Sequence, residues 1–235
     1  MIPQAKGKMF LADERGCSEM DWFRSYYTFN FATYNSEHKT PFGPLYVLND
    51  DTLAGGKSLS IEVEKDTTVL LLPVVGAITI HDATGNAENI EAGQCRLYTA
   101  GKSAILTIKN PFDHDLVNFL QLCIKQPAAS ADMSQQTVSF DIDAHKNQLI
   151  ELGESIAHYH LYIGKFSGRS ETAWHLQHPG NGVFVFVIEG AFEVQYRLLH
   201  ARDGLALWDI DSIELEALSN DAIILLMELP IRNEE

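Results

Sequence analysis

The sequence predicts an all-β protein that is built from two copies of one barrel. Short runs of alternating apolar and polar residues recur along the 235 residues, and turn-forming residues separate them. Few segments repeat apolar residues with the helical period. A Gly-Ala pair interrupts an apolar run at Gly76 and again at Gly190, which indicates an internal repeat. A small polar stretch, 126–136, therefore separates two expected domains, 1–127 and 137–235.

The stretch Ser58–Asp82 is expected to supply consecutive strands of the first barrel. Leu59, Ile61 and Val63 alternate with polar residues, so they share one strand face. The apolar run 69–75 is typical of a strand buried on both faces, although periodicity alone leaves a buried helix open. Because Pro73 cannot donate a ladder hydrogen bond, it predicts an edge strand or a bulge.

The other strands are predicted by the same alternation and by the turn residues around them. They are expected within 41–51 and at 77–81, 95–99, 104–108, 117–124, 158–165, 183–189, 191–198, 206–210, 212–218 and 222–229.

Charge restricts the partners of this protein. Lys and Arg total 17 and Asp and Glu total 32, giving a formal net charge of -15. An acidic chain repels phosphate backbones and anionic lipid, so neither nucleic acid nor a membrane surface is an expected partner. Base stacking is one use of the aromatic-rich segment 22–34. The charge favours a packing role instead, as an aromatic wall between the N-terminal segment and the barrel.

The termini and the cysteines predict a cytoplasmic protein. The first residues lack the apolar core of a secretory signal, and no apolar run is long enough to span a bilayer. Cys17, Cys95 and Cys123 are odd in number and widely spaced, as expected of free thiols in a reducing compartment. Cys17, close to Arg15, is a candidate redox residue, although an inert loop thiol is favoured. The other two are expected to be small buried hydrophobes.

Several segments resemble the signature of the pirin family in their order and spacing. They are Arg15-Gly16, Trp22, the segments 27–34 and 42–51, and Ala100-Gly101. The match covers roughly 15–124, and the segment 184–194 resembles the C-terminal cupin of quercetinase-like relatives. The resemblance implies a bicupin, with two cupin barrels (double-stranded β-helices, or jelly rolls) in one chain. It also implies the quercetin dioxygenase activity that some pirins have.

Metal-binding pirins hold iron with a His-x-His pair and a His-x-Glu pair. The resemblance places the first pair on Glu62 and Glu64 and the second on Leu106 and Ile108. Iron sites for oxygen chemistry use imidazoles together with a carboxylate, and aliphatic side chains offer no lone pair. No catalytic residue and no cofactor are therefore expected, and these four positions become the expected lining of a ligand cavity.

Glu62 and Glu64 would point into the barrel if their strand keeps the family's orientation. Two buried like charges are costly unless they are solvated, protonated or paired. The pair can form a weak site for a hard cation, bind a cationic or polar ligand, or stay hydrated in an open cavity mouth, which is the favoured interpretation. Lys57, Lys65 or Arg96 could also neutralise it.

Histidines in the second half form the other candidate metal group. His158 and His160 share a strand face, and His175 and His178 flank a loop. Together they could hold zinc or iron. The cupin pattern is incomplete, however, because Val183 stands where a ligand glutamate would fall. Histidines that only form hydrogen bonds are therefore the favoured interpretation.

Two further groups could act as acid–base pairs: His81 with Asp82, and His114 with Asp113 and Asp115. Each lies in an expected turn or at a strand end, where Asp and His commonly form local hydrogen bonds.

The sequence thus predicts a cytoplasmic, monomeric, pirin-like bicupin without the family's iron site. Its expected role is to bind a small molecule or a protein partner without catalysis. The alternative is a quercetinase-type dioxygenase that uses iron or another divalent metal at a rearranged site, at Glu62 and Glu64 or at the second-half histidines. Oxidation sensing through Cys17 is a third hypothesis. Fold alone does not decide among them, whereas bound metal separates the first two.

Overall fold

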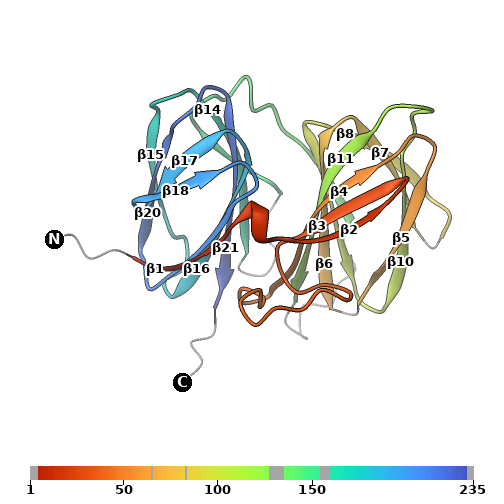
Figure 1. Ribbon diagram of the computed structural model, residues 1–235, viewed down its shortest axis with the longest axis horizontal. Helices are drawn as coiled ribbons and strands as arrows, with labels where there is room; N and C mark the ends of the chain where they lie inside the picture. The colour runs from red at the N-terminus through yellow and green to blue at the C-terminus, as the bar shows by residue number, and fades with distance from the viewer. Residues whose placement is uncertain (1–4, 65, 83, 127–134, 154–158, 232–235) are drawn as a thin grey trace. The chain divides into compact units, whose positions relative to one another are not determined.

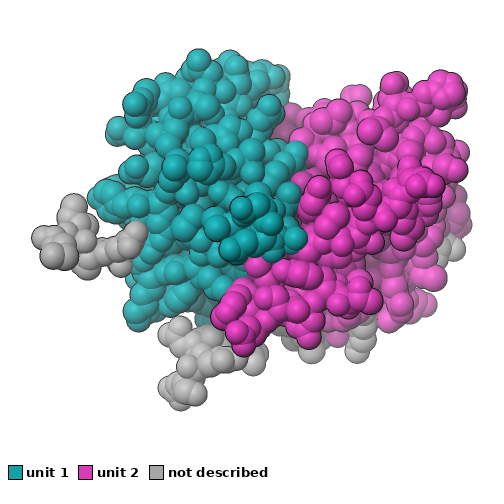
Figure 2. Space-filling view, viewed as in Figure 1, with its two compact units in different colours: residues 1–15, 42–44, 141–235 teal, residues 16–41, 45–140 magenta. Residues whose placement is uncertain are grey.

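The computed structural model describes residues 5–64, 66–82, 84–126, 135–153 and 159–231. The chain forms two compact units (Figure 2). The N-terminal unit comprises residues 16–41 and 45–140, and the C-terminal unit comprises 1–15, 42–44 and 141–235. Apart from one 3-10 turn, η1 (Ala12–Glu14), the elements of the described residues are strands. None of their helices is long and apolar enough to cross a membrane.

The N-terminal unit consists of two antiparallel sheets (Figure 1). The larger has the order β12 (Gln135–Ser139), β9 (Gln94–Ala100), β6 (Thr67–Val75), β11 (Val117–Lys125), β4 (Leu45–Leu53), β3 (Phe23–Tyr27) and β2 (Gly16–Met20). The smaller has the order β5 (Ser58–Val63), β10 (Ala104–Lys109), β7 (Ala77–His81) and β8 (Ala87–Glu91). Buried apolar side chains from both sheets form one core between them, which we call the first barrel.

The C-terminal unit repeats this arrangement (Figure 1). Its larger sheet has the order β1 (Lys6–Phe10), β19 (Gly204–Trp208), β16 (Asn181–Glu189), β21 (Ala222–Pro230), β14 (His160–Phe166) and β13 (Leu149–Glu151). Its smaller sheet has the order β15 (Glu171–His175), β20 (Ser212–Ala217), β17 (Ala191–Val194) and β18 (Arg197–His200). A second apolar core lies between these sheets, in what we call the second barrel.

The two units differ from the expected ranges 1–127 and 137–235. Strand β1 pairs with β19, so the first residues of the chain complete the C-terminal unit. Phe10 is buried there, with its ring centroid 5.5 Å from that of Phe184, and Lys6 bonds Asp209 at 2.7 Å. At the other boundary, β12 pairs with β9 and so extends the N-terminal unit to residue 140. Both unit boundaries thus depend on strands that pair at a sheet edge, β1 and β12. Such pairing leaves no local signal in the sequence.

Strand β6 tests two predictions about the first barrel. Its residues are buried up to Pro73, as the apolar run indicates. It lies between β9 and β11, so the edge position is wrong. The bulge is confirmed, because the register with β11 shifts where Pro73 opposes Phe119 and Val75 opposes Asn118. The shift accommodates a residue that cannot donate to the ladder.

Gly76 and Gly190 hold equivalent places in the two barrels. Each lies between a long central strand and the next strand, and each has φ +80°. A Cβ on Gly190 would lie 2.4 Å from Ser219 Oγ. The expected single strand 191–198 is instead the hairpin β17–β18, which turns at Gln195 and Tyr196 with φ 45° and 60°. Positive φ at two successive residues is the conformation of a tight hairpin turn.

The aromatic segment 22–34 packs within the N-terminal unit. Trp22, Phe23 and Phe31 lie against its core, and Phe29 is buried. The ring of Tyr34 covers Gly16, where a Cβ would lie 2.4 Å from the ring. The expected structural role of this segment is thus supported by its contacts.

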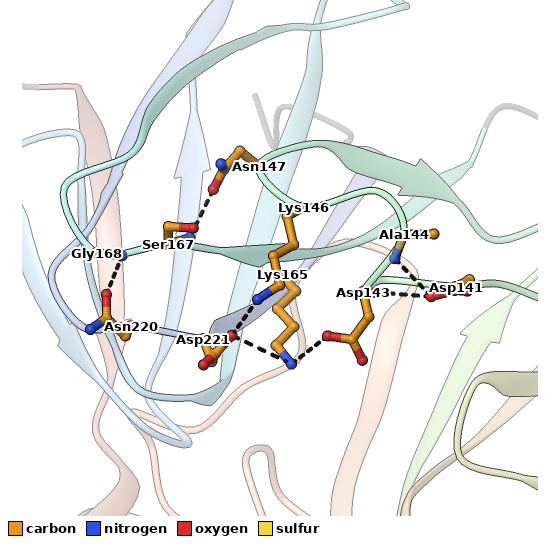
Figure 3. Close-up of polar contacts among 10 residues, drawn as sticks. All are labelled: Asp141, Asp143, Ala144, Lys146, Asn147, Lys165, Ser167, Gly168, Asn220 and Asp221. Atoms are coloured by element: carbon orange, nitrogen blue, oxygen red, sulfur yellow. Dashed lines mark hydrogen bonds and ion pairs between the residues drawn. The ribbon is translucent and has the colours of Figure 1, made fainter.

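A polar network ties the segment after β12 to the second barrel (Figure 3). Lys165 on β14 bonds Asp143 at 2.7 Å and lies 3.5 Å from Asp221, which also bonds Lys146 at 3.0 Å. The carboxylates of Asp143 and Asp221 raise the pKa of Lys165. The network therefore anchors residues 143–146, which follow β12, to β14 and to Asp221, directly before β21.

Candidate functional site

The interior of the first barrel is aliphatic where the family's ligands are expected. Strands β5 and β10 pair so that Leu106 opposes Ile61 and Ile108 opposes Leu59. Leu106 and Ile108 are fully buried in the core, and Leu59 and Ile61 pack against it. Both expected positions on β10 therefore face inward, but they present only methyl groups.

Glu62 and Glu64 do not join these residues, and the expectation that they line the cavity is wrong. Both side chains are exposed, because the alternation of β5 turns its apolar residues inward. Glu64 forms an ion pair with Lys125. Arg96 pairs with Glu88 at 2.9 Å instead, and Lys65 lies outside the described residues.

The donor set of the first barrel does not fit the iron that the resemblance implies. Iron in oxygenases requires imidazole and carboxylate ligands, and the facing residues of β5 and β10 have no lone pairs to offer. Within the described ranges, no three His, Cys, Asp or Glu side chains form a metal-binding group. A hollow beside Leu106 measures only about 30 Å³, which leaves room for little more than a water molecule.

Asp51 is a buried acid inside the first barrel that the sequence reasoning missed. It lies on β4 with only 1% of its surface exposed, and its Oδ1 has no hydrogen-bond partner among the described residues. Burial raises the pKa of Asp51 to about 7; the nearby Ser25 hydroxyl opposes this shift and the Asp50 charge adds to it. The available signal was an acidic pair within a strand flanked by Leu48 and Leu53.

One end of the second barrel is polar. It comprises Glu151, His160, His178, Asn181 and Glu228, which we call the polar end. His160 accompanies Tyr162 on the inward face of β14, and it opposes Glu228 across the β14–β21 ladder. The sheet geometry thus brings together residues that are far apart in the sequence.

His160 is the central residue of the polar end. Its Nδ1 lies 2.8 Å from Glu151 Oε1, whereas its Nε2 is buried without a hydrogen-bond partner in the described part of the chain. Its ring centroid lies 5.3 Å from that of His178, with 30° between the planes. The ring also stacks on Tyr162, and burial, with a contribution from Glu151, raises the Tyr162 pKa to about 12.

Glu228 positions the loop that carries His178. Its fully buried carboxylate accepts hydrogen bonds from the backbone N–H of Gln177 at 2.9 Å, the backbone N–H of His178 at 2.8 Å and Asn181 Nδ2 at 2.8 Å. Three donors stabilise a buried carboxylate. This carboxylate therefore fixes the backbone at His178 relative to β21.

The structure brings together only part of the predicted histidine group. His160 and His178 are neighbours. His175 is exposed on β15, where it opposes Ser212, while Trp174 turns inward. His158 lies outside the described residues.

A separate hollow of about 470 Å³ lies over the smaller sheet of the second barrel. Glu171, Glu216 and Glu193 are cross-strand neighbours on β15, β20 and β17. Arg169 bonds Glu216 at 2.9 Å. Like charges on adjacent strands destabilise a sheet. This row of glutamates therefore lowers the stability of the sheet, and the fold does not require it.

The remaining candidates have local roles. Cys95 and Cys123 are buried, and burial raises their thiol pKa values to about 12 and 11. Cys17 is exposed on β2, so its oxidation stays a prediction, to be tested by a peroxide mass shift that Cys17→Ser removes. Asp82 accepts hydrogen bonds from Thr84 and Asn86 and closes a turn, as expected from composition.

Comparison with known proteins first identifies the class. The structure resembles that of the Escherichia coli protein YhhW, with a TM-score of 0.88 at 22% identity over 98% of this chain and 100% of that one. It also resembles a quercetin 2,3-dioxygenase from Acinetobacter baumannii, with a TM-score of 0.74 at 16% identity over 95% and 86% of the two chains. The chain therefore has the bicupin fold, and the predicted fold class is confirmed.

The sequence comparisons give relatives of the same kind. Residues 156–229 match the family described as the quercetinase C-terminal cupin domain. The chain is 25% identical to an E. coli quercetin 2,3-dioxygenase over 93% of this chain and 96% of that protein. It is 22% identical to a pirin-like protein of Caulobacter vibrioides over 91% and 96%. The chain thus resembles pirin-like and quercetinase-type proteins over most of its length, as its sequence indicates.

Proposed function

We propose that this pirin-like bicupin acts by binding, without quercetin oxygenation. The observation that carries the proposal is the burial of Leu106 and Ile108, two of the four positions where the resemblance implies iron ligands. They pair with Ile61 and Leu59, which are aliphatic too. Several relatives are named quercetin 2,3-dioxygenases, and this chain resembles them in fold. Their chemistry requires a metal, for which these two strands supply no donor.

The bound molecule needs a site outside the first barrel. The hollow of about 470 Å³ over β15, β20 and β17 has a volume typical of small-molecule pockets. Its glutamates, among them Glu193 and Glu214, favour a cationic ligand or a basic protein segment. We place this activity in the cytoplasm and assign it to a monomer, and the three cysteines, free in the structure, are compatible with a reducing compartment.

Turnover tests the proposal. Protein purified without chelator is supplied in turn with iron, nickel, manganese and copper, while quercetin absorbance and oxygen uptake are followed. The E. coli quercetin 2,3-dioxygenase serves as the positive control. We expect rates equal to those of the metal alone. Metal-dependent turnover above that background would overturn the proposal.

The alternative is a metal-dependent dioxygenase with a rearranged site. The contact between His160 and His178 favours a location in the second barrel, whereas the exposure of Glu62 and Glu64 disfavours the first. Turnover that disappears in His160→Ala and persists in His175→Ala would support this alternative. His175 is the matched control because it lies on the exposed face of β15.

A further inference from the structure

We propose that the polar end of the second barrel binds one divalent transition-metal ion through the imidazoles of His160 and His178. The inference goes beyond the proposed function, because it concerns a metal site that shares no residue with the hollow proposed for the ligand, and because it requires no oxygenation. It rests on the unpartnered nitrogen of His160, the spacing of the two rings and the support that fixes each of them.

One ring nitrogen of His160 forms no hydrogen bond among the described residues. Nδ1 lies against the Glu151 carboxylate at 2.8 Å, so in the neutral ring Nδ1 carries the proton and Nε2 carries the lone pair. That Nε2 is buried and has no hydrogen-bond partner among the described residues. A buried polar atom without a partner destabilises the folded state. A metal ion bound at Nε2 would remove this destabilisation, and the carboxylate–histidine arrangement is the usual support of a metal-bound imidazole.

The imidazole rings of His160 and His178 have a spacing that suits two ligands of one ion. The centroids of His160 and His178 lie 5.3 Å apart. Two imidazoles on one tetrahedral ion, with metal–nitrogen bonds of about 2.0–2.1 Å, place their centroids roughly 5 Å apart. The observed separation therefore suits two ligands of a single ion.

The strand that carries His160 and the loop that carries His178 are both held in place. His160 lies within β14, paired with β21, and its ring stacks on Tyr162. The backbone of His178 is held by the fully buried carboxylate of Glu228, which also binds Asn181. A binding site held by strands and buried hydrogen bonds is preorganised, so little entropy is lost when the ion binds.

The donor set indicates the class of metal. Two imidazole nitrogens suit zinc, nickel or copper, whereas magnesium and calcium prefer oxygen ligands. Two protein ligands leave the other coordination positions to water or to an anionic or carbonyl ligand. The site is therefore open in the sense of a catalytic rather than a structural metal centre.

The test uses the full chain, freed of metal with a chelator and then titrated with nickel or zinc in a calorimeter. We expect one equivalent to bind, with affinity at least tenfold lower in His160→Ala and in His178→Ala. Glu151→Gln should weaken binding by about 10–100-fold, as loss of a ligand-orienting group does. His175→Ala, on the exposed face of β15, should bind like the parent.

Copper provides an independent readout. Electron paramagnetic resonance of the copper-loaded protein should show two nitrogen ligands, and His160→Gln, which retains a polar side chain of similar reach, should show one. Circular dichroism checks that each variant is folded. The inference is overturned by the absence of stoichiometric binding in the folded parent, by binding that survives in His160→Gln unchanged, or by equal loss in His175→Ala. These outcomes measure metal binding alone, so failure of this inference leaves the proposed non-catalytic function standing.

Discussion

At the scale of the residue, Asp51 makes the stability of the folded protein depend on pH. Its carboxyl group is buried, and the folded state raises its pKa to about 7, whereas an unfolded Asp titrates near 3.9. Between these values the folded chain holds a proton that the unfolded chain has released. The stability that the protonated Asp51 contributes is therefore fully present below the pKa of Asp51 in the unfolded chain. It is lost as pH rises through the pKa of Asp51 in the folded chain.

Asp51→Asn removes this pH dependence. The amide stays neutral, so the variant should gain stability over the parent as pH rises from about 5 to about 8, by an amount of order a few kcal/mol. Urea unfolding of both proteins across this range measures the difference. Asp113→Asn, at an exposed carboxylate, is the control and should keep the parent's pH slope. If Asp51→Asn keeps that slope too, the Asp51 carboxyl is already ionised in the folded protein.

Residue-level prediction from the family's pattern succeeded on one strand and failed on another. Leu106 and Ile108 were placed inside the barrel by counting along that pattern, and they are buried. Glu62 and Glu64 were placed inside by counting from the family's pattern, whereas the alternation of Leu59, Ile61 and Val63 turns them outward. A one-residue change of register reverses the face of every side chain, so the alternation of the chain itself was the better guide.

The sequence grouped His160 with His178, but the roles of Glu151 and Glu228 beside them could not be read from it. His160 and Glu151 meet because β13 and β14 pair, and His178 arrives on a loop that Glu228 holds. Such proximity depends on tertiary pairing, which leaves no local pattern.

At the scale of the element, glycine sets the bend between the long and short strands of each barrel. Gly190 combines φ +80° with close neighbours: an added Cβ would lie 2.4 Å from Ser219 Oγ and 2.8 Å from Ala222 Cβ. The same bend occurs at Gly76. The Gly-Ala pairs at Gly76 and Gly190 were the internal repeat in the sequence, so the duplication of the barrel could be predicted from two short motifs.

Gly190→Ala should destabilise the protein by more than the cost of positive φ alone. Left-handed backbone costs an alanine roughly 1–2 kcal/mol, and overpacking adds about 1–3 kcal/mol. Gly85→Ala is the matched control, because Gly85 has φ +87° but nothing within 4 Å of its added Cβ. Denaturant midpoints compare the two variants. Equal losses would mean that contact with Ser219 and Ala222 contributes nothing.

Element prediction was weakest for short and edge strands. β1, β2 and β12 lie at sheet edges, where burial is partial and the alternation is correspondingly weak. The strongly apolar central strands β6, β11, β16 and β21 were all anticipated, since burial on both faces leaves a continuous apolar run.

At the scale of the whole molecule, the first residues of the chain complete the last barrel. β1 covers the edge of β19, and Phe10 is buried among residues of the C-terminal unit. The two units are therefore each assembled from separated parts of the chain, and a cut at the expected linker would separate β1 from its sheet.

Deletion of residues 1–11 should destabilise the C-terminal unit. Loss of the Phe10 side chain alone removes roughly 2 kcal/mol of apolar burial, and the uncovered edge of β19 should promote aggregation. Differential scanning calorimetry and light scattering measure both effects. Deletion of residues 1–4, which leaves β1 intact, is the control. An unchanged melting temperature in the longer deletion would show that β1 is dispensable.

At the same scale, iron content tests whether the first barrel lacks an iron site. The double variant His160→Ala with His178→Ala removes the proposed site in the second barrel and leaves the first barrel intact. This variant, expressed with added iron and purified without chelator, is assayed by elemental analysis. We predict no stoichiometric iron, because Leu59, Ile61, Leu106 and Ile108 offer it no ligand. One equivalent of iron per folded chain would contradict this prediction.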